Sequence, residues 1–261
     1  MNRIVFICPT CPPYDSAIRL LESFRFNHLN DQSDLFFVFS SKADSDLFID
    51  YENKIVIQDS YELQSKSKPS VLYGKKLFAL NVLKYSYRYL ITIDDDSFFY
   101  QNVDLLSICK NFYHDKILLG NFCQTSNNVV SRIIKSSYLC VANRNSSLVL
   151  DSNLYLWSNQ LCIYSNSLID DFFCTIDYYN RMFNWKFEEF EYYIYMYYLI
   201  IYHNFLIVDM CFPVSAAHSC CEHSIPSSYN LLPQILNRIM QCRKTSITAV
   251  DNKNLTLIIK N

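Results

Sequence analysis

Three consecutive aspartates in the middle of the chain are the residues best suited to chemistry. Asp94, Asp95 and Asp96 follow directly after the apolar run 89–93. Carboxylates this close repel one another, and Mg²⁺ or Mn²⁺ would neutralise them while leaving positions for substrate phosphates. The pattern therefore predicts a metal and phosphate site, although acidic residues after a strand also serve simply to form a turn.

A second acidic group, Glu188, Glu189 and Glu191, lies just before the tyrosine-rich helix of a predicted helical region, 187–202. Carboxylates are favoured at a helix N-terminus on electrostatic grounds alone. Alternatively, Glu188 or Glu189 accepts a proton from a substrate hydroxyl as a general base. Consecutive helical residues point in different directions, so we expect at most one of the two to face a substrate.

The cysteines offer a third kind of chemistry. Residues 8–11 match a redox Cys-x-x-Cys spacing, and Cys220 and Cys221 beside His218 resemble half of a zinc site. Two prolines after Cys11 make immediate entry into a helix awkward, and a second Cys-x-x-Cys is missing from the sequence. Eleven cysteines, an odd number, are better explained as reduced thiols in a cytoplasm.

The elements that must position these residues alternate between strand and helix. Apolar runs followed by loop residues predict strands, and apolar residues at helical spacing predict helices. The order is strand 3–8, a helix beginning at Asp15, strand 35–39, a short helix or loop, strand 54–57, helix 72–89 and strand 89–93. This alternation favours an α/β fold with a parallel, doubly wound sheet, whose ligands gather at the carboxyl ends of strands. The aspartates stand at such an end.

The second half of the chain is less regular. Its predicted strands are 117–121, 138–142, 161–164 and 205–210, and its predicted helices are 168–181, 187–202 and 230–244. The last helix is amphipathic and locally basic, so it either packs on the catalytic domain or touches the cytoplasmic face of a membrane.

In the order of these features the chain resembles the GT-A glycosyltransferases of bacterial surface-glycan synthesis. Their strand-end Asp-x-Asp motif holds a metal on the diphosphate of a nucleotide sugar, and residues 94–96 resemble it. Residues 73–80 are similar to the lysine-bearing helix before that motif, and residues 157–161 to the segment that shapes the sugar and acceptor site. Residues 188–191 look like an acidic motif that opens a later helix, and His218 like a metal-binding histidine.

The resemblance implies a single Rossmann-like, GT-A-like domain with a mostly parallel mixed sheet flanked by helices. Residues 1–220 would form the catalytic domain, with a nucleotide-binding half at about 1–100 and an acceptor half at 101–220. Residues 221–261 would be a C-terminal helical tail.

The resemblance also implies the activity. It is that of a hexosyltransferase that uses Mn²⁺ or Mg²⁺ to move a sugar from a nucleotide donor, UDP-linked by preference, to a hydroxyl of a glycan or lipid-linked acceptor. Inversion is favoured over retention. The implied metal ligands are Asp94, Asp96 and His218; the nucleotide-binding residues are Pro9, Thr10, Lys75, Lys76, Asp94 and Asp95; Trp157 and Asn159 contact the acceptor; Glu188 or Glu189 is the catalytic base. The two lysines also have a plainer interpretation as solvated helix residues.

Two other functions stay open at this point. A metal-dependent phosphohydrolase also uses an Asp-x-Asp pair after a strand, but usually on its first strand, whereas here about 90 residues come before the motif. A redox or zinc-binding interaction module could instead be built on the cysteines. Bound zinc would support the module, and manganese binding enhanced by a nucleoside diphosphate would support the transferase.

Composition narrows the partners. A net charge of -2 offers no general attraction for nucleic acid, and two glycines leave no Gly-rich loop to wrap a phosphate. The tyrosine-rich run 192–202 is well short of a spanning helix, which needs roughly 20 apolar residues. We therefore expect a cytoplasmic protein. Its helix 230–244 either packs on the catalytic domain or makes peripheral contact with the membrane.

Overall fold

The computed structural model describes residues 4–57, 68–97, 99, 102–122, 128–142, 154–156, 161–181 and 184–209. These residues belong to two compact units. The first contains the described part of Met1–Cys109 together with Leu161–Phe187, and the second contains the described parts of Lys110–Gln160 and Glu188–Tyr229. Each unit has its own β-sheet.

The sheet of the first unit has the strand order β3-β2-β1-β4-β7. Its first four members are parallel and β7 is antiparallel to β4. Every residue of β1 and β4 is buried, as expected for continuous apolar strands covered on both faces. The strands are β1 (Ile4–Pro9), β2 (Ser33–Phe39), β3 (Lys54–Val56), β4 (Tyr89–Thr92) and β7 (Cys162–Ser165).

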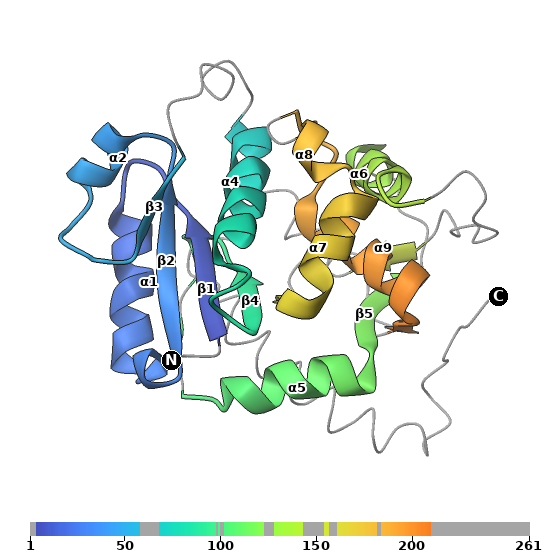
Figure 1. Cartoon of the computed structure of the whole chain (residues 1–261), viewed down its shortest axis with the longest axis horizontal. Coiled ribbons are helices and arrows are strands. Elements are labelled where there is room, and N and C mark those ends of the chain that lie inside the picture. Colours follow the sequence, from blue (N-terminus) through green and yellow to red (C-terminus); the bar gives the residue numbers. More distant parts are fainter. Residues whose placement is uncertain are drawn as a thin grey trace. The chain divides into compact units, whose positions relative to one another are not determined.

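Helices connect these strands. The longest, α4 (Lys68–Leu83), packs on β1, β2 and β4 (Figure 1). Helix α1 buries one face, made of Ala17, Leu20, Leu21 and Phe24, and the short α2 contacts β2 and β3. The remaining helices are α1 (Asp15–Phe26), the 3-10 turn η1 (Leu29–Asp31), α2 (Lys42–Leu47), α7 (Asn166–Thr175) and α8 (Tyr178–Arg181).

This architecture confirms the predicted α/β class, with a mixed and mostly parallel sheet flanked by helices. The predicted order of elements up to residue 93 is also confirmed. The boundaries of one helix differ from the prediction: α4 begins at Lys68 and ends at Leu83, whereas the predicted helix spans 72–89. The division into halves at about residue 100 stays a prediction.

The second unit has a three-stranded sheet in the order β6-β5-β8. Strand β8 is parallel to β5, and β6 is antiparallel to it. Helix α6 packs against the tyrosine-rich helix α9. The elements are α5 (Leu105–Asp115), which begins in the first unit, β5 (Ile117–Phe122), α6 (Asn128–Leu139), β6 (Leu154–Leu156), α9 (Glu191–His203) and β8 (Leu206–Asp209).

One predicted strand is wrong. Residues 138–142 were expected to be extended, but α6 runs to Leu139 and turns follow it. From the middle of α6 to residue 142, the buried residues are Ile133, Ile134, Ser137 and Val141. Their spacing of three to four is that of one helix face, so the apolar run belongs to a helical pattern that begins further upstream.

Helix α9 is apolar almost all round. Tyr193, Tyr195, Tyr197 and Tyr198 are all buried in it, which is the pattern of a helix enclosed by protein. Across the described ranges, no helix combines the length and the apolar character needed to cross a membrane. The predicted helix 230–244 lies outside the described residues.

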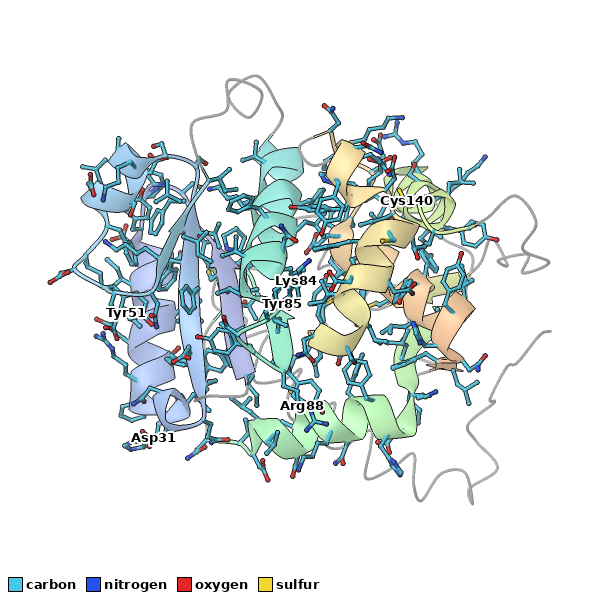
Figure 2. All side chains as sticks on the ribbon, in the orientation of Figure 1. Asp31, Tyr51, Lys84, Tyr85, Arg88 and Cys140 are labelled. Carbon is cyan, nitrogen blue, oxygen red and sulfur yellow. The ribbon has the colours of Figure 1, made fainter. Side chains whose placement is uncertain are left out.

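An ion pair joins Lys84, which directly follows α4, to Asp170 of α7 within the first unit, and the Asp170 side chain is 56% exposed. The Lys84 ammonium lies 2.5 Å from the Asp170 carboxylate, and the Lys84 side chain is 6% exposed. Burial alone would lower the pKa of Lys84, but hydrogen bonds to Asp170 and to the Tyr179 hydroxyl raise it above its ordinary value. The ammonium also lies 4.9 Å from the ring centroid of Tyr85 (Figure 2). The pair anchors the end of α4.

Replacing Asp170 with alanine should leave this buried cation without its carboxylate. We expect Asp170→Ala to lower the free energy of unfolding by about 1 kcal/mol, a value reduced by solvent screening because the Asp170 side chain is 56% exposed. Asp46→Ala is the matched control, because its partner Lys42 is 74% exposed and surface pairs contribute about 0–1 kcal/mol. Urea unfolding of the two variants checks this, and equal losses would contradict the anchoring role.

Candidate functional site

The three aspartates follow β4 directly beside the end of β1. The two strands are parallel and neighbours, with Ile7 opposite Thr92. The amide of Ile93 donates to the carbonyl of Ile7 at 3.0 Å, which continues the pairing up to the first aspartate. Residues that follow β1 and residues that follow β4 therefore emerge side by side at the carboxyl edge of the sheet.

Asp95 turns inward at this edge. The Thr10 hydroxyl donates to its carboxylate, with 3.1 Å between Oγ1 and Oδ2. Burial raises the pKa of Asp95 to about 6; the Thr10 hydrogen bond opposes the rise, and the neighbouring Asp94 and Asp96 add to it. Asp95 is thus held by the protein, and its carboxyl keeps its proton to a higher pH than an exposed aspartate does.

Asp94 is neutralised in a different way. Its carboxylate lies 2.9 Å from the ammonium of Lys76, a residue of α4. The Asp94 side chain is 63% exposed and the Lys76 side chain 7% exposed, so the cation approaches from within the protein. This pair brings a positive charge to the turn.

Lys75 and Lys76 of α4 are both buried. The alternative that Lys75 and Lys76 are ordinary solvated helix residues is therefore wrong. The Lys75 ammonium donates to the carbonyl of Thr10 at 2.7 Å, and burial lowers its pKa. The sequence could not reveal this burial, because it depends on how α4 packs on β1, β2 and β4 in the folded protein.

The aspartates themselves form a tight turn. The Ser97 amide donates to the Asp94 carbonyl at 3.2 Å, and Asp96 is exposed. The chain leaving the turn is anchored to α1, since the Phe99 amide donates to Ser23 Oγ and the Phe99 carbonyl accepts from the Asn27 side chain. The turn is therefore supported from both strands and from a helix.

The donor chemistry of this turn fits a magnesium or manganese ion that shares its ligands with a substrate. Asp94 and Asp96 present exposed carboxylates, and Mg²⁺ is usually held by one or two carboxylates together with substrate phosphates and water. Within the described residues, no three His, Cys, Asp or Glu side chains group to hold a metal by themselves. The predicted third ligand, His218, lies outside these residues.

The cysteine at the end of β1 does not suit redox chemistry. Cys8 is fully buried, and burial, reinforced by Asp95 and Asp94, raises the pKa of its thiol well above the ordinary value. Reactive thiols need a lowered pKa. Cys8 and the exposed Cys11 are both free, so this part of the chain weakens the redox alternative.

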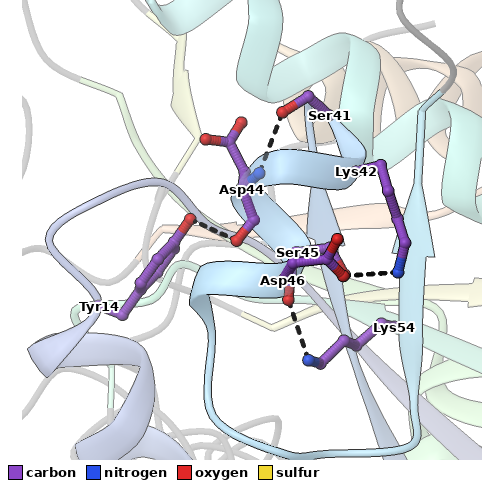
Figure 3. A network of polar contacts seen from close by, with 7 residues as sticks. All are labelled: Tyr14, Ser41, Lys42, Asp44, Ser45, Asp46 and Lys54. Atoms are coloured by element: carbon purple, nitrogen blue, oxygen red, sulfur yellow. Dashed lines mark hydrogen bonds and ion pairs between the residues drawn. The ribbon is translucent and has the colours of Figure 1, made fainter.

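A polar network after β1 and β2, at the carboxyl edge of the sheet, was not predicted from the sequence. The Tyr14 hydroxyl donates to the Asp44 carbonyl at 2.9 Å, which ties the loop after β1 to α2 (Figure 3). Ser41 caps α2 by accepting from the Asp44 amide. A serine three residues before Asp44 could have predicted the N-cap of α2 from the sequence. The contact of Tyr14 depends on tertiary structure and could not have been predicted in this way.

The acidic group belongs to the second unit. Helix α9 begins at Glu191, so Glu188 and Glu189 lie just before the tyrosine-rich helix, as predicted, although the predicted helical region began at Phe187. Glu189 is buried, and Glu188 is half-buried with Arg132 3.9 Å away. The Glu188 carbonyl also accepts from Ser137 of α6. A role as catalytic base stays a prediction for both.

Several predicted site residues are not described. Trp157, Asn159 and His218, and the pair Cys220 and Cys221, lie outside the described residues. Pro9 and Thr10 are described, and both are buried at the end of β1. Their predicted role at a nucleotide stays a prediction.

Comparison with solved structures gives several matches, and one of them is described here. The structure resembles that of mouse xyloside xylosyltransferase 1 in its apo form, with a TM-score of 0.38 and 8% identity over 77% of this chain and 82% of that chain. A TM-score this low identifies no activity. No family model and no curated protein matches the sequence.

The raised pKa of Asp95 predicts a pH-dependent cost. A carboxyl that holds its proton more tightly when folded lowers stability as pH rises from about 4 to about 6, and the full cost persists above that. In chelator-treated protein we expect Asp95→Asn to raise the free energy of unfolding by about 1–3 kcal/mol at pH 8. The gain should vanish near pH 4. Urea titrations across this range measure it, and a pH-independent difference would refute the assignment.

Proposed function

We propose that this protein is a glycosyltransferase that transfers a sugar from a nucleotide donor, UDP-linked by preference, to a hydroxyl of a glycan or lipid-linked acceptor. The observation that carries the proposal is the turn of three aspartates at the carboxyl end of β4, with Lys76 paired to Asp94 and Thr10 to Asp95. Ligands of open α/β sheets bind at this edge, and the turn combines carboxylates with a cation.

A metal ion would supply charge stabilisation for a departing nucleoside diphosphate. Asp94 and Asp96 would hold it, with His218 as the proposed third ligand. These residue types are hard or intermediate ligands that suit Mn²⁺ and Mg²⁺. The predicted chemistry therefore needs few protein ligands, in agreement with the two exposed carboxylates of the turn.

The residues of the chain have separate tasks in this proposal. Lys76 places a positive charge beside Asp94, where it would stabilise negative charge on the diphosphate. Asp95, held by Thr10, fixes the turn. Pro9 and Thr10 end β1 at the edge proposed to receive the nucleotide.

The acceptor side rests on the sequence. Trp157 and Asn159 are the proposed contacts of the acceptor, and Glu188 or Glu189 the proposed base that takes the proton of its hydroxyl in an inverting reaction. Placement at the cytoplasmic face of a membrane through residues 230–244 is likewise a proposal.

The central test is stabilisation by ligand. A compound that binds only the folded protein raises its melting temperature, so UDP with MnCl₂ should raise the Tm of the wild type by several degrees. We expect Asp96→Ala to abolish this rise while keeping the wild-type Tm without ligand, because an exposed carboxylate supports no core. Asp50→Ala, also exposed, is the control and should respond normally.

An unchanged response of Asp96→Ala would remove this aspartate from the site. The wild-type protein should also be incubated with a UDP-sugar and an acceptor glycan, and the products separated. Release of inorganic phosphate in place of sugar transfer would favour the phosphohydrolase.

The proposed base gives a second prediction. Replacing a general base with its amide removes proton transfer and leaves binding intact. We expect Glu188→Gln or Glu189→Gln to lower turnover by about 10²-fold or more, with little change in UDP affinity. Glu52→Gln is the surface control. Two fully active variants would exclude the inverting mechanism through these residues.

A further inference from the structure

Lys75 is a charged residue that the protein encloses. It is 1% exposed, and its ammonium donates to the backbone carbonyl of Thr10. Burial lowers its pKa. Enclosing a cation costs free energy that a methionine of similar length would avoid. The contact made by this ammonium is therefore the place to look for its role.

Thr10 receives contacts from three elements. Its amide donates to the Val38 carbonyl of β2 at 3.1 Å, and its carbonyl accepts from Lys75 of α4 at 2.7 Å. Its hydroxyl donates to Asp95 at 3.1 Å. The residue is 1% exposed. Thr10 thus transmits the position of α4 and of the sheet to the middle aspartate.

The state of Asp95 decides how the turn presents its neighbours. Asp95 is partly buried against Thr10, whereas Asp94 and Asp96 are exposed. Holding the central carboxylate inward leaves the two flanking carboxylates at the surface. A turn free to rotate would lose this arrangement and would pay entropy to restore it on binding.

We propose that Lys75 is a positioning residue for the aspartate turn, acting through Thr10 and Asp95 and making no contact with the ligand. Lys76 differs, because it meets Asp94 directly. What the turn binds rests on the function proposed above. This role replaces direct nucleotide binding by Lys75, which its burial disfavours.

A double-mutant cycle tests the chain of contacts. UDP affinity in MnCl₂ is measured by calorimetry for Lys75→Met, for Thr10→Val and for the double variant. If Lys75 acts through Thr10, each single variant should weaken binding by about 10-fold and the double variant by little more, since effects within one network are not additive. Thr10→Ser keeps the hydroxyl and should bind within about three-fold of wild type.

Lys76→Met is the matched control. Because Lys76 acts on Asp94 without Thr10, its effect should multiply with that of Thr10→Val. Multiplying effects for Lys75→Met would mean that Lys75 touches the ligand independently and would overturn the proposal. So would wild-type binding by Lys75→Met or Thr10→Val. If Lys75→Met does not fold, the comparison of Thr10→Val with Thr10→Ser still decides whether the hydroxyl matters.

A readout without UDP separates the two proposals. If the wild type binds no UDP, the proposed function fails, and the contacts are tested by unfolding equilibria alone. Thr10→Val and Asp95→Asn should then change the unfolding constant non-additively, as should Thr10→Val and Lys75→Met. Additive effects in both cycles would overturn the positioning role of Lys75.

Discussion

Three carboxylates in a row at the end of a buried strand form the constraint on which the first unit depends. Such a group repels itself, and the protein resolves the repulsion differently at each position. Asp94 pairs with Lys76, Asp95 is turned inward to Thr10 with its pKa raised to about 6, and Asp96 faces solvent. These solutions require β1, β4 and α4 to meet at one edge.

Helix α4 carries both charges that support this edge. Lys75 and Lys76 are buried in this helix, and Lys84, which directly follows its end, pairs with Asp170. Buried cations are costly unless they are paired or hydrogen-bonded. Lys75 donates to a backbone carbonyl, and Lys76 pairs with the exposed Asp94 carboxylate. Lys84 pairs with Asp170 and lies close to three aromatic rings. The helix is thereby held along its length.

Sequence reasoning succeeded where a residue's role depends on near neighbours and failed where it depends on partners far along the chain. The strand before the aspartates is mostly apolar, so its burial and its end were predictable. The prediction of a strand at 138–142 was wrong because it considered a short apolar run without the helical spacing of the residues before it. The helical region predicted from Phe187 begins only at Glu191, since helix boundaries are weakly encoded.

The amino-acid sequence by itself determined the α/β class and the placement of Asp94, Asp95 and Asp96 at a strand end, because the periods of strand and helix are local properties. Only the tertiary structure decided which aspartate is paired, which is turned inward and which is exposed. It also decided that Lys75 and Lys76 are buried. The physical reason is that these outcomes depend on contacts across 65 residues for Lys75 with Thr10 and 85 for Thr10 with Asp95, and residues so distant meet only when the sheet has formed.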